Sequence, residues 1–482
     1  MKRIIPIFII VFFLFFTFFL KSQDIALNNA TGKIFPDKST DEYYIIDSII
    51  ITGNNITRRH IILRELQYKE NDTVGKIMFG KYIKTSRENL LNTSLFNFVN
   101  IDYNIKENKK VTLRINVIER WYTWPYPLFE IADRNFNTWL EEKDLSRTNY
   151  GLFLVRENFR GRKEILKFLV KMGYEEEYGF SYKIPYLNKN QRSGISVSFA
   201  HSRFHEIPYT STSNKLVYFR EHQRFARIDY EGEIIYSYRQ GIYNTHNLEI
   251  YYNNTRISDS LSVLSKEYIN NGKTQREYLS LSYLYKRDCR DSKAYPLSGY
   301  YFDISLTKDG IGIINDNNLY ITYINTSFCE YFTISKRLYF ANSLSAKISN
   351  KSFQPYYIQK SLGYGNDFVR SFEYYVMDGQ HFALYKSNFK YALLPTRIHK
   401  FNFIKTEKFN TIHYALYVNL FGDAAYVSDE QLKRNNPLSN TFIYGGGIGI
   451  DFVTYYDKVF RLEYSINMLG ESAVFLHFIA PI

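Results

Sequence analysis

The chain has 482 residues, more than an ordinary single domain, which favours one large unit together with a smaller one. Its hydrophobic content of 45% and charged content of 23% are near average and exclude global disorder. Tyrosine (45 residues) and phenylalanine (39 residues) are abundant, as expected where apolar surfaces meet water along two membrane interfaces. The formal charge of +13 is diffuse, so we expect contact with an anionic lipid bilayer and no nucleic-acid partner.

Residues 1–22 have the pattern of a secretory signal peptide. Lys2 and Arg3 precede an uncharged apolar run from Ile4 to Leu20, and polar sequence follows from Ser22. The alternative is an uncleaved membrane anchor, because the run is close to the length of a spanning helix. Residues 23–41 show no periodicity and are expected to be a linker.

Residues 42–120 are predicted to form a small α/β unit. Thr57 is expected to be the N-cap of a short helix, with Ile56 and Ile61 packing across it as a hydrophobic staple. A second helix is predicted over 77–92 from the recurrence of apolar residues on one side. Runs rich in β-branched residues predict three strands, over 44–52, 99–105 and 111–119. The expected order is therefore strand, helix, helix, strand, strand.

Residues 121–482 show a repeated pattern of strands and turns, with no helix predicted between them. Apolar and polar residues alternate in 195–199, 279–283, 302–306 and 460–468, so that each strand has one apolar and one polar face. A soluble sandwich has the same period, but its segments are usually shorter. We expect a closed transmembrane β-barrel, because in lipid every backbone polar group must be paired. Spanning strands of about 10 residues give about 16 antiparallel strands, with Arg461 and Glu463 facing a polar lumen.

The stretch from Leu362 to Gly379 combines loop-forming glycines with an unusual cation. Phe368, Val369 and Phe372 surround Arg370, although a segment in water would not be expected to carry such bulky apolar groups. A guanidinium that leaves bulk water needs a charged, hydrogen-bonding partner. We therefore expect this loop to fold back onto a surface that offers both apolar contacts and a carboxylate.

Several segments of the small unit resemble a POTRA domain, the periplasmic module of outer-membrane assembly factors. The segments that carry the resemblance are Ile49–Asn55, Ile62–Leu66, Leu91–Phe96 and Val117–Trp121. A single such unit is visible, whereas the many-module assembly factors carry several.

Three motifs in the larger unit are similar to those of the POTRA-plus-barrel surface antigen superfamily, which includes BamA-like assembly factors and two-partner secretion transporters. They are a strand-start motif, a loop motif and a strand motif. Their residues are Arg287, Asp288, Arg290, Asp291, Pro296 and Gly299; Val369, Arg370 and Phe372; and Phe421 and Asp423. The resemblance implies that the loop enters the barrel, that Arg370 contacts Asp423, and that Phe421 packs nearby.

The chain departs from the family pattern at several positions. Ser371 and Ala425 stand where glycine is usual, and Asn388 stands where the family often has glutamate, which implies a thinner ionic network. The last strand, 470–478, has an aromatic end, but Ile479–Ile482 extend beyond it.

The sequence offers little support for catalysis. The nine histidines are scattered, and we expect His201 and His205 to be polar residues at an interface or in a loop, with no metal site. Cys289 and Cys329 are expected to remain unpaired. Neither a serine-hydrolase elbow nor a phosphate-binding loop is present, so an outer-membrane lipase lacks support. We therefore expect that the protein is not an enzyme and that it binds no cofactor.

The resemblance implies a bacterial outer-membrane protein that inserts or translocates other polypeptides, with its POTRA domain in the periplasm. Expected partners are the outer-membrane bilayer, unfolded or secreted client polypeptides and accessory assembly subunits. The alternative is a passive channel or a structural surface antigen without protein transport. A TonB-dependent receptor is disfavoured, because no plug-sized domain precedes the barrel.

Overall fold

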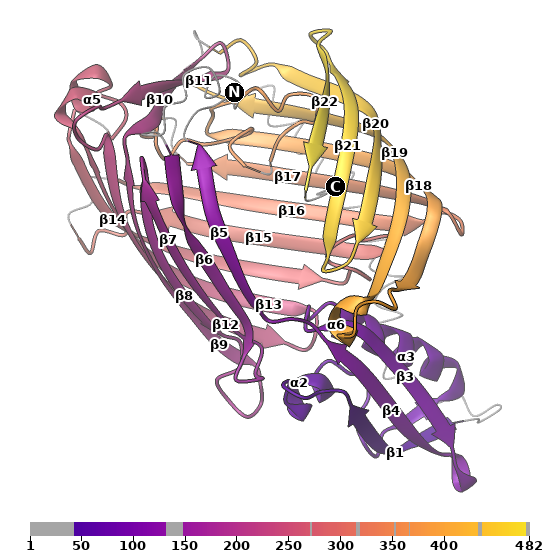
Figure 1. Ribbon diagram of the computed structural model, residues 1–482. Coiled ribbons are helices and arrows are strands. Elements are labelled where there is room, and N and C mark those ends of the chain that lie inside the picture. The colour runs from indigo at the N-terminus through magenta and orange to yellow at the C-terminus, as the bar shows by residue number, and fades with distance from the viewer. Residues whose placement is uncertain are drawn as a thin grey trace.

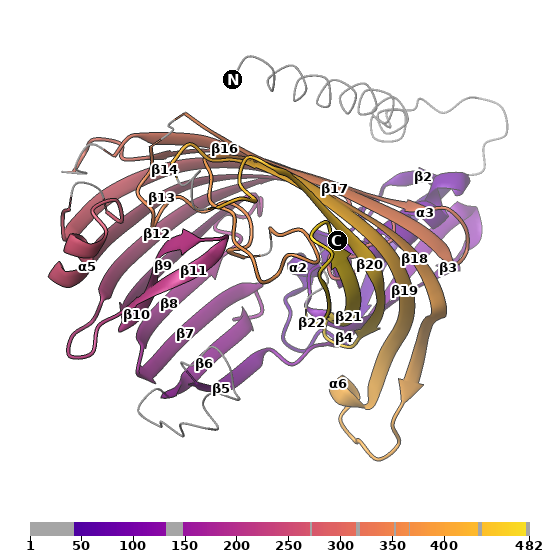
Figure 2. The ribbon, with the colours of Figure 1, turned by 90° about the horizontal axis from the view of Figure 1, so that it is seen from above.

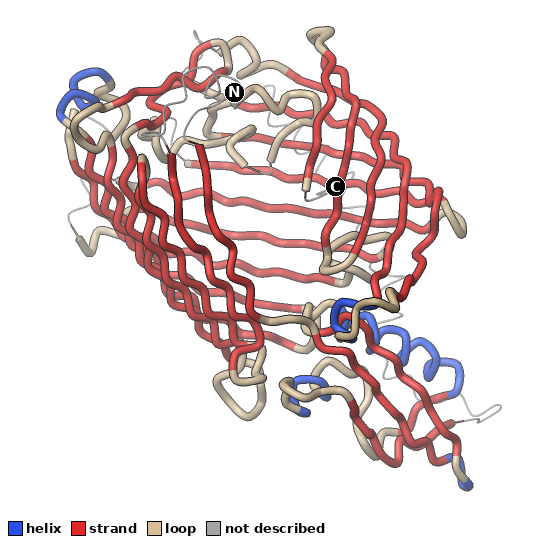
Figure 3. Tube along the Cα trace, viewed as in Figure 1, coloured by secondary structure: helices blue, strands red, loops and turns tan. Residues whose placement is uncertain are grey.

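A computed structural model describes residues 43–131, 148–269, 272–314, 319–350, 353–365, 367–431 and 436–478. A small α/β domain lies at one end of a large curved sheet (Figure 1). Strands dominate the described chain, and helices are few and short (Figure 3). The expected signal peptide, the expected linker and the terminal extension 479–482 lie outside the described residues.

The small domain is a four-stranded sheet with helix α3 packed on it. Its elements are β1 (Tyr43–Thr52), α2 (Arg59–Leu63), β2 (Thr73–Gly75), α3 (Lys76–Leu91), β3 (Phe96–Ile105), the 3₁₀ turn η1 (Glu107–Lys109) and β4 (Lys110–Glu119). The strand order is β2-β1-β4-β3, and β1 runs parallel to β4. The three predicted strands and the long helix are therefore confirmed. The three-residue strand β2 was not predicted.

The prediction that Thr57 caps the first helix is wrong. Helix α2 begins at Arg59, and Arg58 occupies the cap position without a side-chain capping bond. The Thr57 hydroxyl instead accepts a hydrogen bond from Asn158 of the large unit at 2.8 Å. Ile56 is 39% exposed and does not act as a buried staple.

The large unit is a 16-stranded antiparallel sheet in which nearly every strand pairs with its neighbours in sequence. Its first eight strands are β5 (Thr123–Ile131), β6 (Thr148–Phe159), β7 (Glu164–Gly173), β8 (Glu176–Ile184), β9 (Ser193–Phe204), β12 (Arg227–Gln240), β13 (Asn244–Ile257) and β14 (Gln275–Asp288). The other eight are β15 (Gly299–Asp309), β16 (Ile321–Thr333), β17 (Leu338–Ser349), β18 (His381–Lys400), β19 (Thr411–Ser428), β20 (Phe442–Thr454), β21 (Lys458–Asn467) and β22 (Ser472–His477).

Three smaller elements lie between consecutive strands of this sheet. The hairpin of β10 (Glu206–Thr212) and β11 (Lys215–Arg220) forms a separate two-stranded sheet between β9 and β12. The short helices α5 (Asp259–Leu264) and α6 (Glu407–Asn410) follow β13 and β18. Among the described residues, no helix combines the length and the apolar character needed to cross a membrane.

The predicted alternation determines which side chains face outward. In β21, Leu462, Tyr464 and Ile466 are about half exposed, with exposed fractions of 50%, 51% and 52%. The intervening Arg461 and Glu463 are each only 1% exposed. The outer face is therefore apolar, as contact with lipid requires, and the polar groups face inward as predicted.

The sheet curls but its two edges do not pair. Strand β5 pairs only with β6 and β22 only with β21 in the described part of the chain, and Figure 2 shows these strands at the two edges of the curved sheet. The predicted sixteen-stranded architecture is present, but the described residues show no pairing between its first and last strands, which a closed cylinder would have. One physical reason is that Pro125 and Pro127 lack backbone N–H donors, and proline inside a strand is found mainly on edge strands or at bulges. Strand β22 also has only six residues with which to pair.

The small domain docks on the turns at one end of the sheet. Glu65 accepts hydrogen bonds from Arg239 at 2.7 and 2.8 Å. On the other side of the domain, Arg120 donates to Asp457 in the turn between β20 and β21, at 2.6 and 2.9 Å. Tyr186, which follows β8, is part of the apolar core of the small domain. The two units therefore share an interface that is both ionic and apolar.

Candidate functional site in the barrel lumen

The loop between β17 and β18 packs against the inner face of the sheet. Leu362 and Met377 exchange two backbone hydrogen bonds, of 3.1 and 2.9 Å, which close the segment between them. Val369 and Phe372 are fully buried, with exposed fractions of 0% and 1%. They belong to one apolar cluster with inward-facing residues from the final strands, namely Phe382, Leu384, Ala425, Val427 and Ile443. Apolar contacts therefore hold the loop on the concave side of the sheet (Figure 2).

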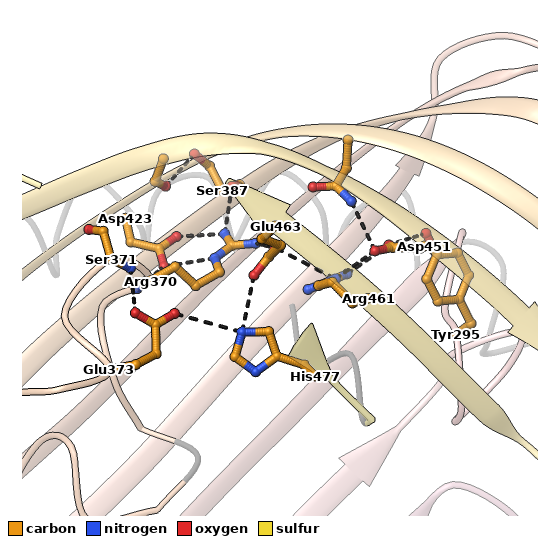
Figure 4. A network of polar contacts seen from close by, with 12 residues as sticks. Tyr295, Arg370, Ser371, Glu373, Ser387, Asp423, Asp451, Arg461, Glu463 and His477 are labelled. Carbon is orange, nitrogen blue, oxygen red and sulfur yellow. Dashed lines mark hydrogen bonds and ion pairs between the residues drawn. The ribbon is translucent and has the colours of Figure 1, made fainter. Parts of the chain in front are cut away.

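Arg370 and Asp423 form a buried, bidentate ion pair at the centre of this contact (Figure 4). The guanidinium donates from Nη2 to Oδ1 at 2.6 Å and from Nε to Oδ2 at 2.9 Å. The backbone N–H of Arg370 also donates to Oδ2, at 3.0 Å. The guanidinium carbon lies 4.0 Å from the centre of the Phe421 ring. The loop motif and the strand motif thus meet as the family resemblance implies.

The ion pair continues into a row of alternating charges. Glu463 lies 3.5 Å from Arg370 and 3.6 Å from Arg461, and Arg461 pairs with Asp451 at 2.6 Å. Asp451 accepts further hydrogen bonds from Tyr295 at 2.7 Å and from Asn419 at 2.9 Å. Each buried charge in the row therefore has an opposite charge beside it, which offsets the cost of desolvation. Sequence alternation placed Arg461 and Glu463 inward but did not assign their partners.

The departures from the family pattern have identifiable consequences. Ser371 has a φ of 89°, a left-handed conformation that favours glycine. This conformation explains why the family usually has glycine at this position. Gly445 accommodates Ser371, because a Cβ on Gly445 would meet the Ser371 hydroxyl oxygen at 1.9 Å. Asn388 is fully buried, and its amide atoms have no hydrogen-bond partner in the part of the chain that the structure describes. The carboxylate that Asn388 on β18 does not supply to Arg370 comes from Glu463 on β21.

A hairpin near the opposite end from the small domain contacts the same loop. Asn214, between β10 and β11, accepts a hydrogen bond from Val376 N–H at 2.8 Å and donates to the Val376 carbonyl at 3.0 Å. Asp378 accepts hydrogen bonds from Ser211 and Tyr364. Burial raises the pKa of Asp378 to about 6, although the two hydroxyl donors act in the opposite direction. The hairpin therefore secures the distal part of the loop.

The strand-start motif forms the turn between β14 and β15. Asp291 accepts hydrogen bonds from three backbone N–H groups, and Arg290 pairs with Asp288 at 2.8 Å. Gly299 has a φ of +95°, and a Cβ there would lie 2.2 Å from the Cys289 carbonyl oxygen. Asn92 of the small domain donates to the carbonyls of Arg290 and Asp291, at 3.2 and 3.0 Å. The motif thus shapes a turn on which the small domain docks.

The motif's remaining members and the other candidate residues occupy structural positions. Arg287 donates to the Tyr300 hydroxyl at 2.6 Å, and Pro296 lies within the connecting turn. His201 stacks on Tyr230, with ring centres 4.3 Å apart, and the imidazole of His205 contacts backbone carbonyls. Cys289 and Cys329 are both free thiols, as expected.

Comparison with known proteins identifies the architecture. The chain is similar to BamA from Haemophilus ducreyi lacking POTRA domains 1–3, with a TM-score of 0.51, 15% identity, and coverage of 90% of this chain and 83% of that one. The chain has the fold of BamA-type barrels. This likeness confirms the expected architecture of about sixteen antiparallel strands preceded by a small α/β domain.

Two CdiB structures are also similar. CdiB from Escherichia coli has a TM-score of 0.49 and 8% identity, with 92% of each chain covered. CdiB from Acinetobacter baumannii has a TM-score of 0.48 and 10% identity, with coverage of 90% of this chain and 73% of that one. No protein-family model and no curated protein sequence matches the chain.

Proposed function

We propose that this protein is an outer-membrane assembly or translocation factor. Its α/β domain would act in the periplasm as a POTRA domain that binds client polypeptides, and its barrel would insert or pass them. The observation that carries this proposal is the pair of strand edges on β5 and β22, which have no strand between them in the described chain. Similarity to the BamA fold supports the same role.

An unpaired strand edge can bind an extended polypeptide without reading its sequence. Backbone N–H and C=O groups along such an edge accept an added strand, and this pairing supplies affinity for many different clients. On β5, Pro125 and Pro127 remove two N–H donors and so weaken pairing between β5 and another strand. Strand β22 carries no proline in its described residues and is the better template. We therefore assign the initial client contact in the barrel to β22.

The small domain also has an exposed strand edge that could bind a client. Strand β3 lies at the end of its sheet, and Tyr103 and Ile105 near the strand's end are 53% and 48% exposed. The beginning of β3 faces the barrel, because Asn97 donates to the Lys408 carbonyl and to the Tyr455 hydroxyl, at 3.1 and 2.9 Å. A client paired with the free end of β3 would therefore lead toward the barrel. Client folding can supply the free energy, so the proposed mechanism needs neither catalysis nor a nucleotide.

The buried row of charges is assigned a positioning role. The Arg370 guanidinium joins the lumen loop to β19 through Asp423 and to β21 through Glu463. Strand β21 is the only strand neighbour of β22 in the described chain. The position of the loop is thereby coupled to the edge proposed to bind clients.

Site-specific photocrosslinking in growing cells tests the proposal at the small domain. A photoreactive residue at Ile105, on the edge strand, is expected to capture nascent barrel proteins or one secreted protein. The matched control is Arg114, which is exposed but lies on the inner strand β4, paired with Ile50 of β1 on one side and with Asp102 of β3 on the other. Capture of several barrel proteins indicates assembly, whereas capture of a single secreted protein indicates a dedicated transporter. Membrane conductance without client capture would instead favour a passive channel or a structural surface antigen.

A further inference from the structure

Three potential metal ligands from distant parts of the chain converge beside the lumen loop (Figure 4). Glu373 belongs to the loop, Glu463 to β21, and His477 is the last residue of β22. The His477 Nε2 atom lies 3.4 Å from Glu463 Oε2 and 3.7 Å from Glu373 Oε1. All three of these atoms lie within 4.8 Å of one another. The cluster joins the lumen loop to the terminal strand.

Among the described residues, none offers a hydrogen bond to any of the three converging atoms. The other oxygen of Glu373 accepts a hydrogen bond from the Ser371 N–H at 2.8 Å. The other oxygen of Glu463 lies near Arg370 and Arg461. Glu463 is only 1% exposed, so an unpartnered oxygen in this position is costly unless another group binds it. Other contacts therefore orient the side chains and leave these three atoms available.

The arrangement fits a small divalent metal ion. Zinc binds imidazole nitrogen and carboxylate oxygen at about 2.0–2.2 Å, which places neighbouring tetrahedral ligands about 3.4 Å apart. The two distances from His477 are 3.4 and 3.7 Å and already match, and the two carboxylates, whose ligand atoms lie within 4.8 Å of each other, need only to stay together or draw closer. Two carboxylates also balance the charge of a divalent cation. We propose that Glu373, Glu463 and His477 bind one zinc-type divalent ion, with a fourth position open to water.

The surrounding contacts favour a defined orientation of the histidine. The ring of Phe368 stacks on that of His477, with centres 5.8 Å apart. Tyr374 of the loop packs against Phe475 of β22, with ring centres 5.4 Å apart. Loop and strand are therefore already in contact, and the metal fastens them together. This matters because β22 has only β21 as a strand neighbour in the described chain. The proposal does not depend on the protein handling clients.

Metal titration of the full-length protein in detergent tests the site. Protein treated with a chelator and then dialysed is titrated with Zn²⁺, and in parallel with Co²⁺, whose visible absorption reports its ligands. We expect one tightly bound ion per chain. His477→Gln and Glu373→Gln should each weaken binding by more than about 100-fold, because each removes a direct ligand. Two control variants, His246→Gln and Glu471→Gln, alter residues outside the cluster and should bind as the unmodified protein does.

A second measurement follows the structural consequence. Hydrogen exchange of the β22 backbone should slow when Zn²⁺ is added to the unmodified protein, and should not respond in His477→Gln. Retained heat-modifiable migration on gels shows that a variant still forms its barrel. Absence of stoichiometric metal binding by the unmodified protein would overturn the proposal. Binding that survives both ligand substitutions would place the ion elsewhere and equally overturn it.

Discussion

Glu65 of the small domain and Arg239 of β12 form a bidentate ion pair, with N–O distances of 2.7 and 2.8 Å. The Glu65 side chain is 2% exposed, and the Tyr186 hydroxyl lies 3.4 Å from its Oε1 atom. The pair joins the turn after helix α2 of one unit to strand β12 of the other. It therefore fixes the orientation of the small domain relative to the barrel.

Arg239→Ala is expected to weaken docking of the small domain. Glu65 would remain buried with only the nearby cations Lys163 and Arg64, the latter at 3.5 Å, to offset its charge, at a cost of about 3 kcal/mol. Spin labels on α3 and on the turn between β8 and β9 should report a broader distance distribution. The control is Arg59→Ala, which removes an ion pair with Glu70 whose side chains are about half exposed and which contributes at most about 1 kcal/mol. Equal broadening in both variants would contradict the role of Glu65.

Docking should also weaken in acid. Burial raises the pKa of Glu65, but the Arg239 guanidinium, together with Lys163 and Arg64, outweighs burial and lowers the pKa to about 2 from an ordinary value of 4.5. The undocked carboxyl therefore binds more protons between these two values, so the contribution of the pair is complete above about pH 4.5 and is lost as pH falls toward 2. The same spin labels, followed from pH 7 to pH 3, should show progressive broadening. In Glu65→Gln this component of the pH dependence should disappear.

Removing either partner of the Arg370 and Asp423 pair should loosen the lumen loop while the barrel persists. Each single alanine substitution leaves a buried charge with fewer partners, at a cost of about 3 kcal/mol. The double substitution should be little worse than either single one, because the two residues share one interaction. Activity in cells and the mobility of a spin label on the loop measure the effect. Arg203→Ala, which breaks a partly exposed pair with Glu176, is the control. Additive losses would mean that the two side chains act independently.

Ser371→Gly is expected to stabilise the loop. Ser371 has a φ of 89°, and no described residue forms a hydrogen bond with its buried hydroxyl oxygen. Glycine adopts this conformation without the steric penalty of about 1–2 kcal/mol that other residues incur. Gly445→Ala should have the opposite effect, because its methyl group would occupy the place of the Ser371 hydroxyl. Slower protease cleavage of the loop in the first variant and faster cleavage in the second are the expected results.

The architecture could be predicted because a single physical rule governs each strand. Lipid on one face and a polar lumen on the other require apolar and polar residues to alternate along each strand, and this alternation is visible in segments such as 460–468. Strand β2 was missed because three residues are too few to show a period. Thr57 was misassigned because its hydroxyl contacts Asn158, a residue about one hundred positions away that no local pattern reveals.

The contents of the lumen were harder to predict for the same reason. Sequence chemistry required a carboxylate for Arg370, and the family resemblance proposed Asp423, which the structure places against it. No local pattern indicated that His477 and Glu373 would meet at Glu463, because these residues lie on three separate elements. The open edges also depend on tertiary geometry, although Pro125 and Pro127 were a readable sign that β5 is an edge strand.

Photocrosslinking at the barrel edge tests the central claim most directly. A photoreactive residue replaces Leu476, which is 57% exposed on β22, and in a matched strain replaces Leu281, which is 42% exposed in the middle of the sheet on β14. Both side chains face outward, so lipid contact alone would give the same result at both positions. If the edge of β22 receives client strands, client polypeptides will crosslink at position 476 and not at 281. Equal capture at the two positions, or capture at neither, would contradict the account.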